Sequence, residues 1–185
     1  MNRVVILVFL MLLGAVQVWQ PNYATAQSIT DEGDGTWRRI HVHILMYHYV
    51  SPLPADADAF RIDLTVEPPI FQAHLQYLSE NGYTTISLYD LHQALNLGTP
   101  LPPNPIVLTF DDSYIDHYTV VYPLLRSFGF TGTFFVITGR ADQNNPQHLS
   151  WSEIREMADG GMSMEGHTRT HQDLRSRDLD FLIFE

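Results

Sequence analysis

Short apolar runs alternate along the chain with longer segments in which apolar residues follow helical spacing. The clearest run, residues 105–110 (PIVLTF), is preceded by a proline-rich stretch and followed directly by two carboxylates. A run of β-branched and bulky residues like this is typical of a strand buried on both faces, as in a parallel sheet covered by helices. We predict further strands at residues 41–50, 84–87, 131–138 and 162–165.

Helical spacing of apolar residues separates these predicted strands. The predicted helices lie at residues 69–81, 87–97, 113–127 and 151–159. Two of them open with the sequence of a capping box, at Ser87 and at Ser150. Residues 51–59 and 139–148 are expected to be loops. Regular alternation of strand and helix predicts an α/β fold, either a barrel or a doubly wound sheet.

Composition excludes several kinds of chemistry. The chain has 185 residues, enough for one domain with a substantial core. It has no cysteine, which rules out disulfides, thiolate metal ligands and a cysteine nucleophile. All ten basic residues are arginine, so a Schiff-base lysine is also ruled out. The net charge of −11, without any basic run, argues against nucleic acid as a partner.

The N-terminus has the pattern of an export signal. Arg3 precedes an apolar stretch at residues 4–16, and a small-x-small cleavage site (ATA) ends at residue 26. We predict a signal peptide over residues 1–26 and a periplasmic, cell-envelope or extracellular protein. The apolar stretch is short for a membrane span, which needs about 20 residues, although an uncleaved anchor is the alternative. Residues 27–39 are polar and are expected to form a flexible leader before a folded domain at residues 40–185.

Two adjacent acids, Asp111 and Asp112, follow the central predicted strand. In α/β folds the chemistry lies just beyond the carboxyl ends of the strands. Neighbouring carboxylates repel each other and are costly to desolvate, which favours a positive group beside them. The alternative interpretation is that the pair only caps the helix that follows.

His167 and His171 follow another predicted strand and lie four residues apart. We expect both imidazoles on one side of a helical turn, a spacing that suits two ligands of one metal ion. The spacing alone is a weak indication, but its position places the pair on the same rim as the two acids. Two imidazoles and one carboxylate leave a fourth position open, as in catalytic zinc sites, and also suit cobalt, nickel or iron. His48, near the end of the first strand, is the candidate general acid, or alternatively a core histidine.

The segments TFDD (109–112) and HTRTH (167–171) resemble the first two motifs of the polysaccharide deacetylase family, carbohydrate esterase family 4. Residues 132–136 and 151–161 are also similar to that family. The resemblance implies a distorted (β/α) barrel over residues 40–185 that removes acetyl groups from glycans with one divalent metal ion, zinc being expected. It implies that Asp111 is the catalytic base and that the metal ligands are Asp112, His167 and His171.

A second resemblance concerns residues 44–50 (ILMYHYV), which are similar to the N-terminal strand of the poly-N-acetylglucosamine deacetylase branch. In that branch this strand carries the catalytic acid, which implies that role for His48. There are two departures. Ser113 stands where the family usually has glycine, and the family's later motifs, including an arginine-containing loop, are not found before Glu185. Because residues 178–185 are also strongly apolar, we expect a C-terminally truncated fragment and an incomplete barrel.

These observations predict an exported, metal-dependent hydrolase of non-peptide C–N bonds. It would remove acetyl groups from N-acetylhexosamine residues of an exopolysaccharide or a derived oligosaccharide, and would meet a membrane only through an uncleaved signal segment. One alternative is a metal- and glycan-binding module without turnover, or an inactive fragment. Another is a glycoside hydrolase with Asp111 and Asp112 as its acid pair. Consecutive strand residues point to opposite sides, which disfavours the latter.

Overall fold

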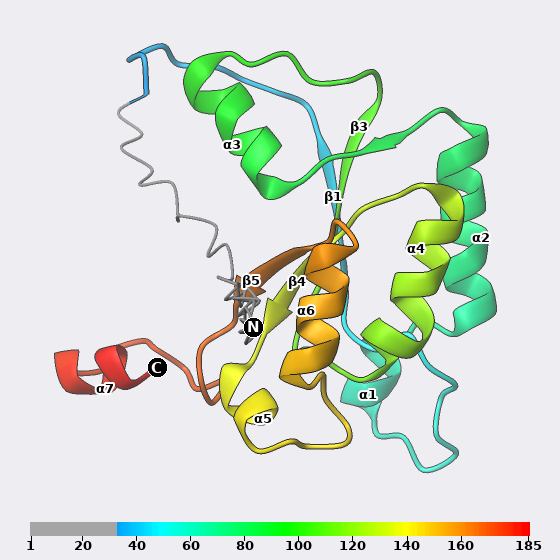
Figure 1. The fold of residues 1–185 in the computed structure, drawn as a ribbon, viewed down its shortest axis with the longest axis vertical. Coiled ribbons are helices and arrows are strands. Elements are labelled where there is room, and N and C mark those ends of the chain that lie inside the picture. The colour runs from blue at the N-terminus through cyan, green and yellow to red at the C-terminus, as the bar shows by residue number, and fades with distance from the viewer. Residues whose placement is uncertain (1–32) are drawn as a thin grey trace, which may run out of the picture. The chain divides into compact units, whose positions relative to one another are not determined.

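The computed structural model of the protein describes residues 33–185 (Figure 1). The predicted signal peptide at residues 1–26 lies outside the described residues and stays a prediction. All five predicted strands are confirmed. They are β1 (His43–Tyr47), β2 (Thr84–Thr85), β3 (Pro105–Phe110), β4 (Thr133–Val136) and β5 (Ser163–Gly166). Every pairing is parallel, in the order β1-β3-β4-β5, and β2 pairs with the beginning of β3. Within residues 33–185 the sheet is open, with β1 and β5 at its edges, as expected for an incomplete barrel.

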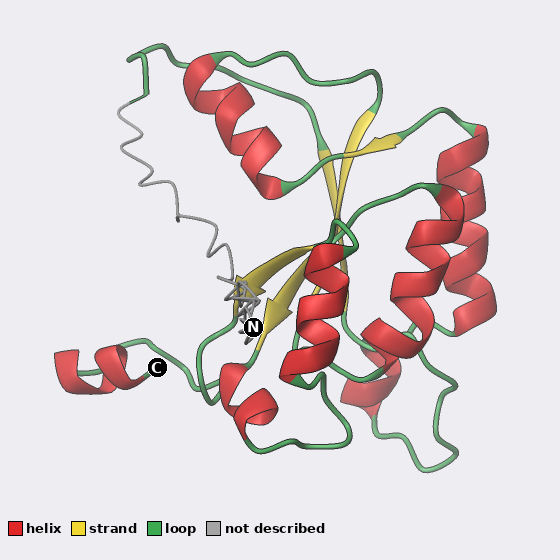
Figure 2. Cartoon of the chain, viewed as in Figure 1, coloured by secondary structure: helices red, strands yellow, loops and turns green. Residues whose placement is uncertain are grey.

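Helices connect the strands, so the α/β fold class is confirmed (Figure 2). They are α1 (Ala59–Asp63), α2 (Pro68–Glu80), α3 (Leu88–Leu97), the π-helical segment η1 (His117–Val121), α4 (Tyr122–Phe128), α5 (Thr138–Asp142), α6 (Trp151–Asp159) and α7 (Leu179–Phe184). Both predicted capping boxes are present, with Ser87 before α3 and Ser150 before α6. No helix within residues 33–185 is long and apolar enough to cross a bilayer.

Among the helices that were not predicted, α1 and α5 lie in or beside a predicted loop. Part of the segment at residues 139–148 forms α5 rather than a loop, and α1 follows the loop at residues 51–59. Each has only five residues, too few for a helical period to show in the sequence. The amides of Thr138 and Gly139 in α5 donate to carbonyls of residues 168 and 169. Contacts with a distant segment therefore support this helix.

The helix predicted at residues 113–127 begins later than expected. Asp112 and Ser113 have φ angles of 73° and 53°, in the left-handed region, so the chain first makes a turn. Helical structure starts with η1 at His117, passes into α4 at Tyr122 and ends at Phe128. The turn occupies the position directly after β3, where the two acids stand.

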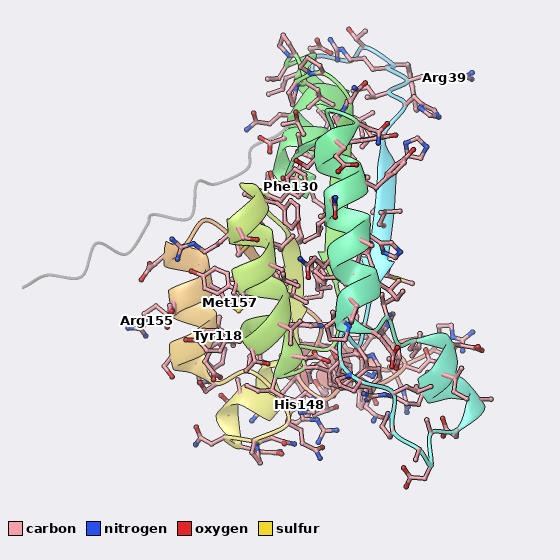
Figure 3. All side chains as sticks on the ribbon, turned by 90° about the vertical axis from the view of Figure 1, so that its right-hand side faces the viewer. Arg39, Tyr118, Phe130, His148, Arg155 and Met157 are labelled. Carbon is pink, nitrogen blue, oxygen red and sulfur yellow. The ribbon has the colours of Figure 1, made fainter. Side chains whose placement is uncertain are left out.

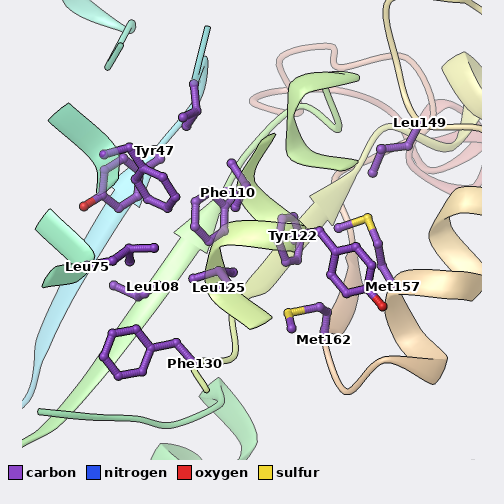
Figure 4. Packing of buried hydrophobic residues seen from close by; sticks show 14 of the residues in the cluster. Tyr47, Leu75, Leu108, Phe110, Tyr122, Leu125, Phe130, Leu149, Met157 and Met162 are labelled. Atoms are coloured by element: carbon purple, nitrogen blue, oxygen red, sulfur yellow. The ribbon is translucent and has the colours of Figure 1, made fainter. Parts of the chain in front are cut away.

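The core lies between the sheet and the layer of α2, α4 and α6 (Figures 3 and 4). Alternate residues of β3 belong to it, because side chains on a strand point to opposite faces in turn. The ring of Phe110 stacks on Tyr47 of β1 at 5.3 Å and on Phe134 of β4 at 4.7 Å. Phe71 and Leu75 of α2 are fully buried against this stack. The packing holds the carboxyl ends of β1, β3 and β4 in register.

Neither end of the described segment contributes a strand to the sheet. Residues 33–39 have no helix or strand, but the Arg38 guanidinium binds the Asp34 carboxylate and donates to the Asn96 carbonyl at 3.0 Å. The leader predicted at residues 27–39 is thus tied to the end of α3 where it is described. The apolar segment at residues 178–185 forms α7, in which Ile183 is 73% exposed.

Candidate metal centre

All five candidate residues of the site follow strands that end on one rim of the sheet. His48 follows β1, Asp111 and Asp112 follow β3, and His167 and His171 follow β5. Parallel strands direct their carboxyl ends to the same edge, where ligands bind in α/β folds. The structure therefore places every site residue predicted from the sequence on the same rim.

Asp112, His167 and His171 converge. The Asp112 Oδ1 lies 3.4 Å from the His167 Nε2 and 3.2 Å from the His171 Nε2. One potential ligand atom from each residue lies within 4.8 Å of the others. Asp112 is 5% exposed, and its Oδ1 is buried without a hydrogen-bond partner. A buried, unpartnered carboxylate oxygen between two imidazoles fits a cation, so these residues could hold a metal ion.

The left-handed turn after β3 directs the Asp112 side chain into the site. A straight strand would send adjacent carboxylates to opposite sides, but the φ of 73° at Asp112 breaks that alternation. Ser113 takes the second left-handed position, which explains why glycine is usual there. Its Oγ accepts from the Ile137 amide at 3.3 Å and its carbonyl from the Leu149 amide at 2.8 Å. These bonds offset a backbone strain of order 1 kcal/mol.

The loop at residues 167–171 is not helical, so the predicted helical turn is wrong. The two imidazoles nevertheless meet, with ring centroids 4.9 Å apart. Thr168 and His171 have φ angles of 61° and 59°, and the His171 amide donates to the Thr168 Oγ1 at 2.9 Å. The amide of Gly139 donates to the Arg169 carbonyl at 2.9 Å, so closely that a Cβ at Gly139 would lie 2.5 Å from that oxygen. A tight turn held from outside therefore replaces the expected helix.

Asp111 and His48 lie beside this group of ligands. The His48 Nε2 is 3.8 Å from the Asp111 Oδ2, and their side chains are 16% and 15% exposed. Burial raises the pKa of Asp111 above its ordinary value, while nearby His48 and His167 oppose the shift. A carboxylate with a raised pKa is better matched to proton transfer near neutral pH. The side chains of the candidate base and the candidate acid are therefore neighbours, and both are largely buried.

Asp116 and His117, which the sequence analysis did not single out, bind the backbone of the segment at residues 48–50. The His117 Nε2–H donates to the His48 carbonyl at 2.7 Å, and the Asp116 Oδ2 accepts from the Val50 amide at 3.0 Å. Both groups are buried. The only sign of this role in the sequence was two polar residues within a segment predicted to be an amphipathic helix. Their hydrogen-bond partners lie more than sixty residues away in the sequence.

His117 is expected to make stability depend on pH. Burial lowers its pKa from 6.5 to about 4, so in acid the unfolded chain binds a proton before the folded protein does. This contribution to the free energy of unfolding is fully present above pH 6.5 and is lost as the pH falls towards 4. The loss at pH 5 is about 2 kcal/mol. In urea titrations, wild type should lose about 2 kcal/mol more than His117→Gln between pH 7.5 and pH 5, since glutamine keeps a donor for His48 but carries no charge. Equal losses would contradict this role.

The fold and the site together define an α/β domain with a candidate metal centre on the carboxyl rim of a parallel sheet. Residues 98–181 match the family described as polysaccharide deacetylase. Residues 98–181 thus carry part of a polysaccharide deacetylase domain, in agreement with the resemblance seen in the motifs.

Three similar proteins support this assignment. YxkH of Bacillus subtilis (strain 168), whose name assigns it to the polysaccharide deacetylases, is 34% identical over 131 residues, covering 71% of this chain and 43% of YxkH. The poly-beta-1,6-N-acetyl-D-glucosamine N-deacetylase of Escherichia coli (strain K12) is 28% identical over 108 residues, covering 51% of this chain and 16% of that protein. The solved structure of Streptococcus pyogenes deacetylase PplD in complex with acetate has a TM-score of 0.72 and 33% identity, covering 79% of this chain and 64% of that one. This chain therefore spans less than two thirds of each.

Proposed function

We propose that this chain carries the site of a metal-dependent deacetylase that removes acetyl groups from N-acetylhexosamine residues of a polysaccharide. The observation that carries the proposal is the convergence of Asp112, His167 and His171 beside Asp111 and His48. The relatives support it, because one is named for deacetylation of poly-N-acetylglucosamine and the solved deacetylase holds acetate, the product of such a reaction.

Asp112, His167 and His171 are the residues that would hold the ion. Two imidazole nitrogens and one carboxylate oxygen suit zinc, which we propose, and also cobalt, nickel or iron. A bound divalent ion supplies Lewis-acid chemistry, which polarises a carbonyl oxygen and makes water more acidic.

The chain's own residues account for the proton transfers. Asp111 accepts the proton of the water that attacks the acetamide carbonyl, and its raised pKa suits that role. His48, on the neighbouring strand end, donates a proton to the departing amine nitrogen. Their side chains lie 3.8 Å apart, which supports the proposal that both act on one acetamide group.

Acetate release from N-acetylglucosamine oligomers tests the proposed function. We expect release that a chelator such as EDTA abolishes and that added zinc restores, because Asp112 and the two histidines cannot themselves activate a carbonyl. The control is the same assay with calcium-loaded EDTA, which spares calcium but still removes zinc. Release that persists at the same rate after zinc has been stripped would contradict the proposal.

A further inference from the structure

The segment between the two histidine ligands is held from two sides. On one side, the Thr138 and Gly139 amides of α5 donate to the carbonyls of Thr168 and Arg169, at 3.2 and 2.9 Å. The amides of the same loop are bound on the other side by a carboxylate that follows α7. The backbone polar groups of this loop thus have partners from two helices far apart in the sequence.

That carboxylate belongs to Glu185. Its Oε2 accepts from the Arg169 amide at 3.1 Å and from the Thr170 amide at 2.8 Å, while its Oε1 accepts from the Thr170 hydroxyl. A second contact lies alongside, where the Arg169 guanidinium sits 4.8 Å from the centroid of the Phe184 ring. Hydrogen bonds to a charged acceptor are roughly twice as strong as those between neutral groups.

The loop needs such support. Thr168 and His171 both have positive φ, a strained conformation for residues with side chains, costing about 1–3 kcal/mol each. Strain of that kind persists only where the surroundings hold it in place. The His171 side chain is 54% exposed, so packing around the imidazole contributes little to its position. Its orientation must come from the loop backbone.

We propose that Glu185 is a positioning residue for the candidate metal centre, whose carboxylate holds the loop in the shape that brings His167 and His171 to one cation. The inference rests on the proposed function for the existence of the metal site. Residues that orient metal ligands from outside the coordination sphere usually change affinity by about 10–100-fold when they are replaced.

Zinc titration tests this role without any measurement of activity. Metal-free wild type, Glu185→Ala and Glu185→Gln are titrated with zinc against a chromophoric chelator. We expect a dissociation constant about tenfold higher for Glu185→Ala and a smaller increase for Glu185→Gln, which keeps one acceptor oxygen. Asp180→Asn is the matched control, since it removes an exposed acid from α7, the helix just before Glu185, and should bind zinc like wild type. Urea unfolding of each variant confirms that it is folded.

The outcomes separate the two proposals. Zinc binding by Glu185→Ala within twofold of wild type, or an equal loss in Asp180→Asn, would overturn the role of Glu185 and leave the deacetylase proposal standing. Wild type that binds zinc with the predicted loss in Glu185→Ala, yet releases no acetate, would support Glu185 and contradict the deacetylase. Wild type that does not bind zinc would overturn both.

Discussion

Replacing Asp112 with asparagine is expected to abolish zinc binding and acetate release together. Asp112 contributes the carboxylate oxygen that lies 3.4 and 3.2 Å from the two imidazoles, and without it only two nitrogen ligands remain. Because even partners outside the coordination sphere affect affinity by about 10–100-fold, loss of this ligand should lower zinc affinity by on the order of 100-fold or more. Chelator-competition titration and the acetate assay measure the two effects on the same protein.

Asparagine is chosen because it tolerates the left-handed backbone at position 112 better than alanine does. The Asp112 Oδ1 makes no hydrogen bond in the protein, so the metal-free variant should unfold at a urea concentration close to that of metal-free wild type. The matched control is Asp173→Asn, an exposed acid two residues beyond His171 that pairs with Arg175. Zinc affinity in Asp112→Asn equal to that of Asp173→Asn would contradict the ligand role.

The strands, and the edge of the sheet that carries the candidate site, could be predicted from the sequence because their sequence signals are local. The apolar run at residues 105–110 marks a buried strand, and the acids after it must then stand at its carboxyl end. Parallel pairing with β1 and β4 follows from the alternation of strands and helices, and brings His48 to the same rim. The participation of distant segments in one site was therefore predictable without coordinates.

The loop conformations could not be predicted in this way. The spacing of His167 and His171 fits a helical turn, but the turn observed depends on amides of α5 and on the Glu185 carboxylate. The five residues from His167 to His171 carry no information about those contacts, because the partners lie elsewhere in the sequence. The side chains of Asp116 and His117 were missed for the same reason, because each has its partner on the strand-end segment at residues 48–50.

The turn at Asp112 and Ser113 shows what a local rule misses. Strand alternation predicts that adjacent carboxylates point apart, which weighed against a glycoside hydrolase with both acids flanking one bond. The left-handed backbone reverses that direction at Asp112, so Asp111 and Asp112 both reach the group formed with the histidines. The burial of Ser113 and its bond from the Ile137 amide explain how a serine occupies a position suited to glycine.

Asp111→Asn is expected to lower the turnover of acetylated oligomers by about 10²–10⁴-fold, the usual contribution of a general base, while zinc affinity stays close to wild type. In wild type a raised pKa of the carboxyl means that activity is lost as the pH falls through a value above the ordinary 3.8. The variant should lack this acid limb, because an amide does not titrate. Acetate release over a pH series, with zinc titration of the same samples, measures both properties.

The comparison of Asp111→Asn with Asp112→Asn separates a hydrolase from a binding module. In a hydrolase both variants lose acetate release but only Asp112→Asn loses zinc, because the neighbouring acids divide base and ligand roles between them. In a metal- and glycan-binding module wild type releases no acetate, and Asp111→Asn binds the glycan as wild type does. An Asp111→Asn protein with wild-type turnover and an unchanged acid limb would assign the proton transfer to another group, and the Asp111–His48 pair at 3.8 Å would then be structural.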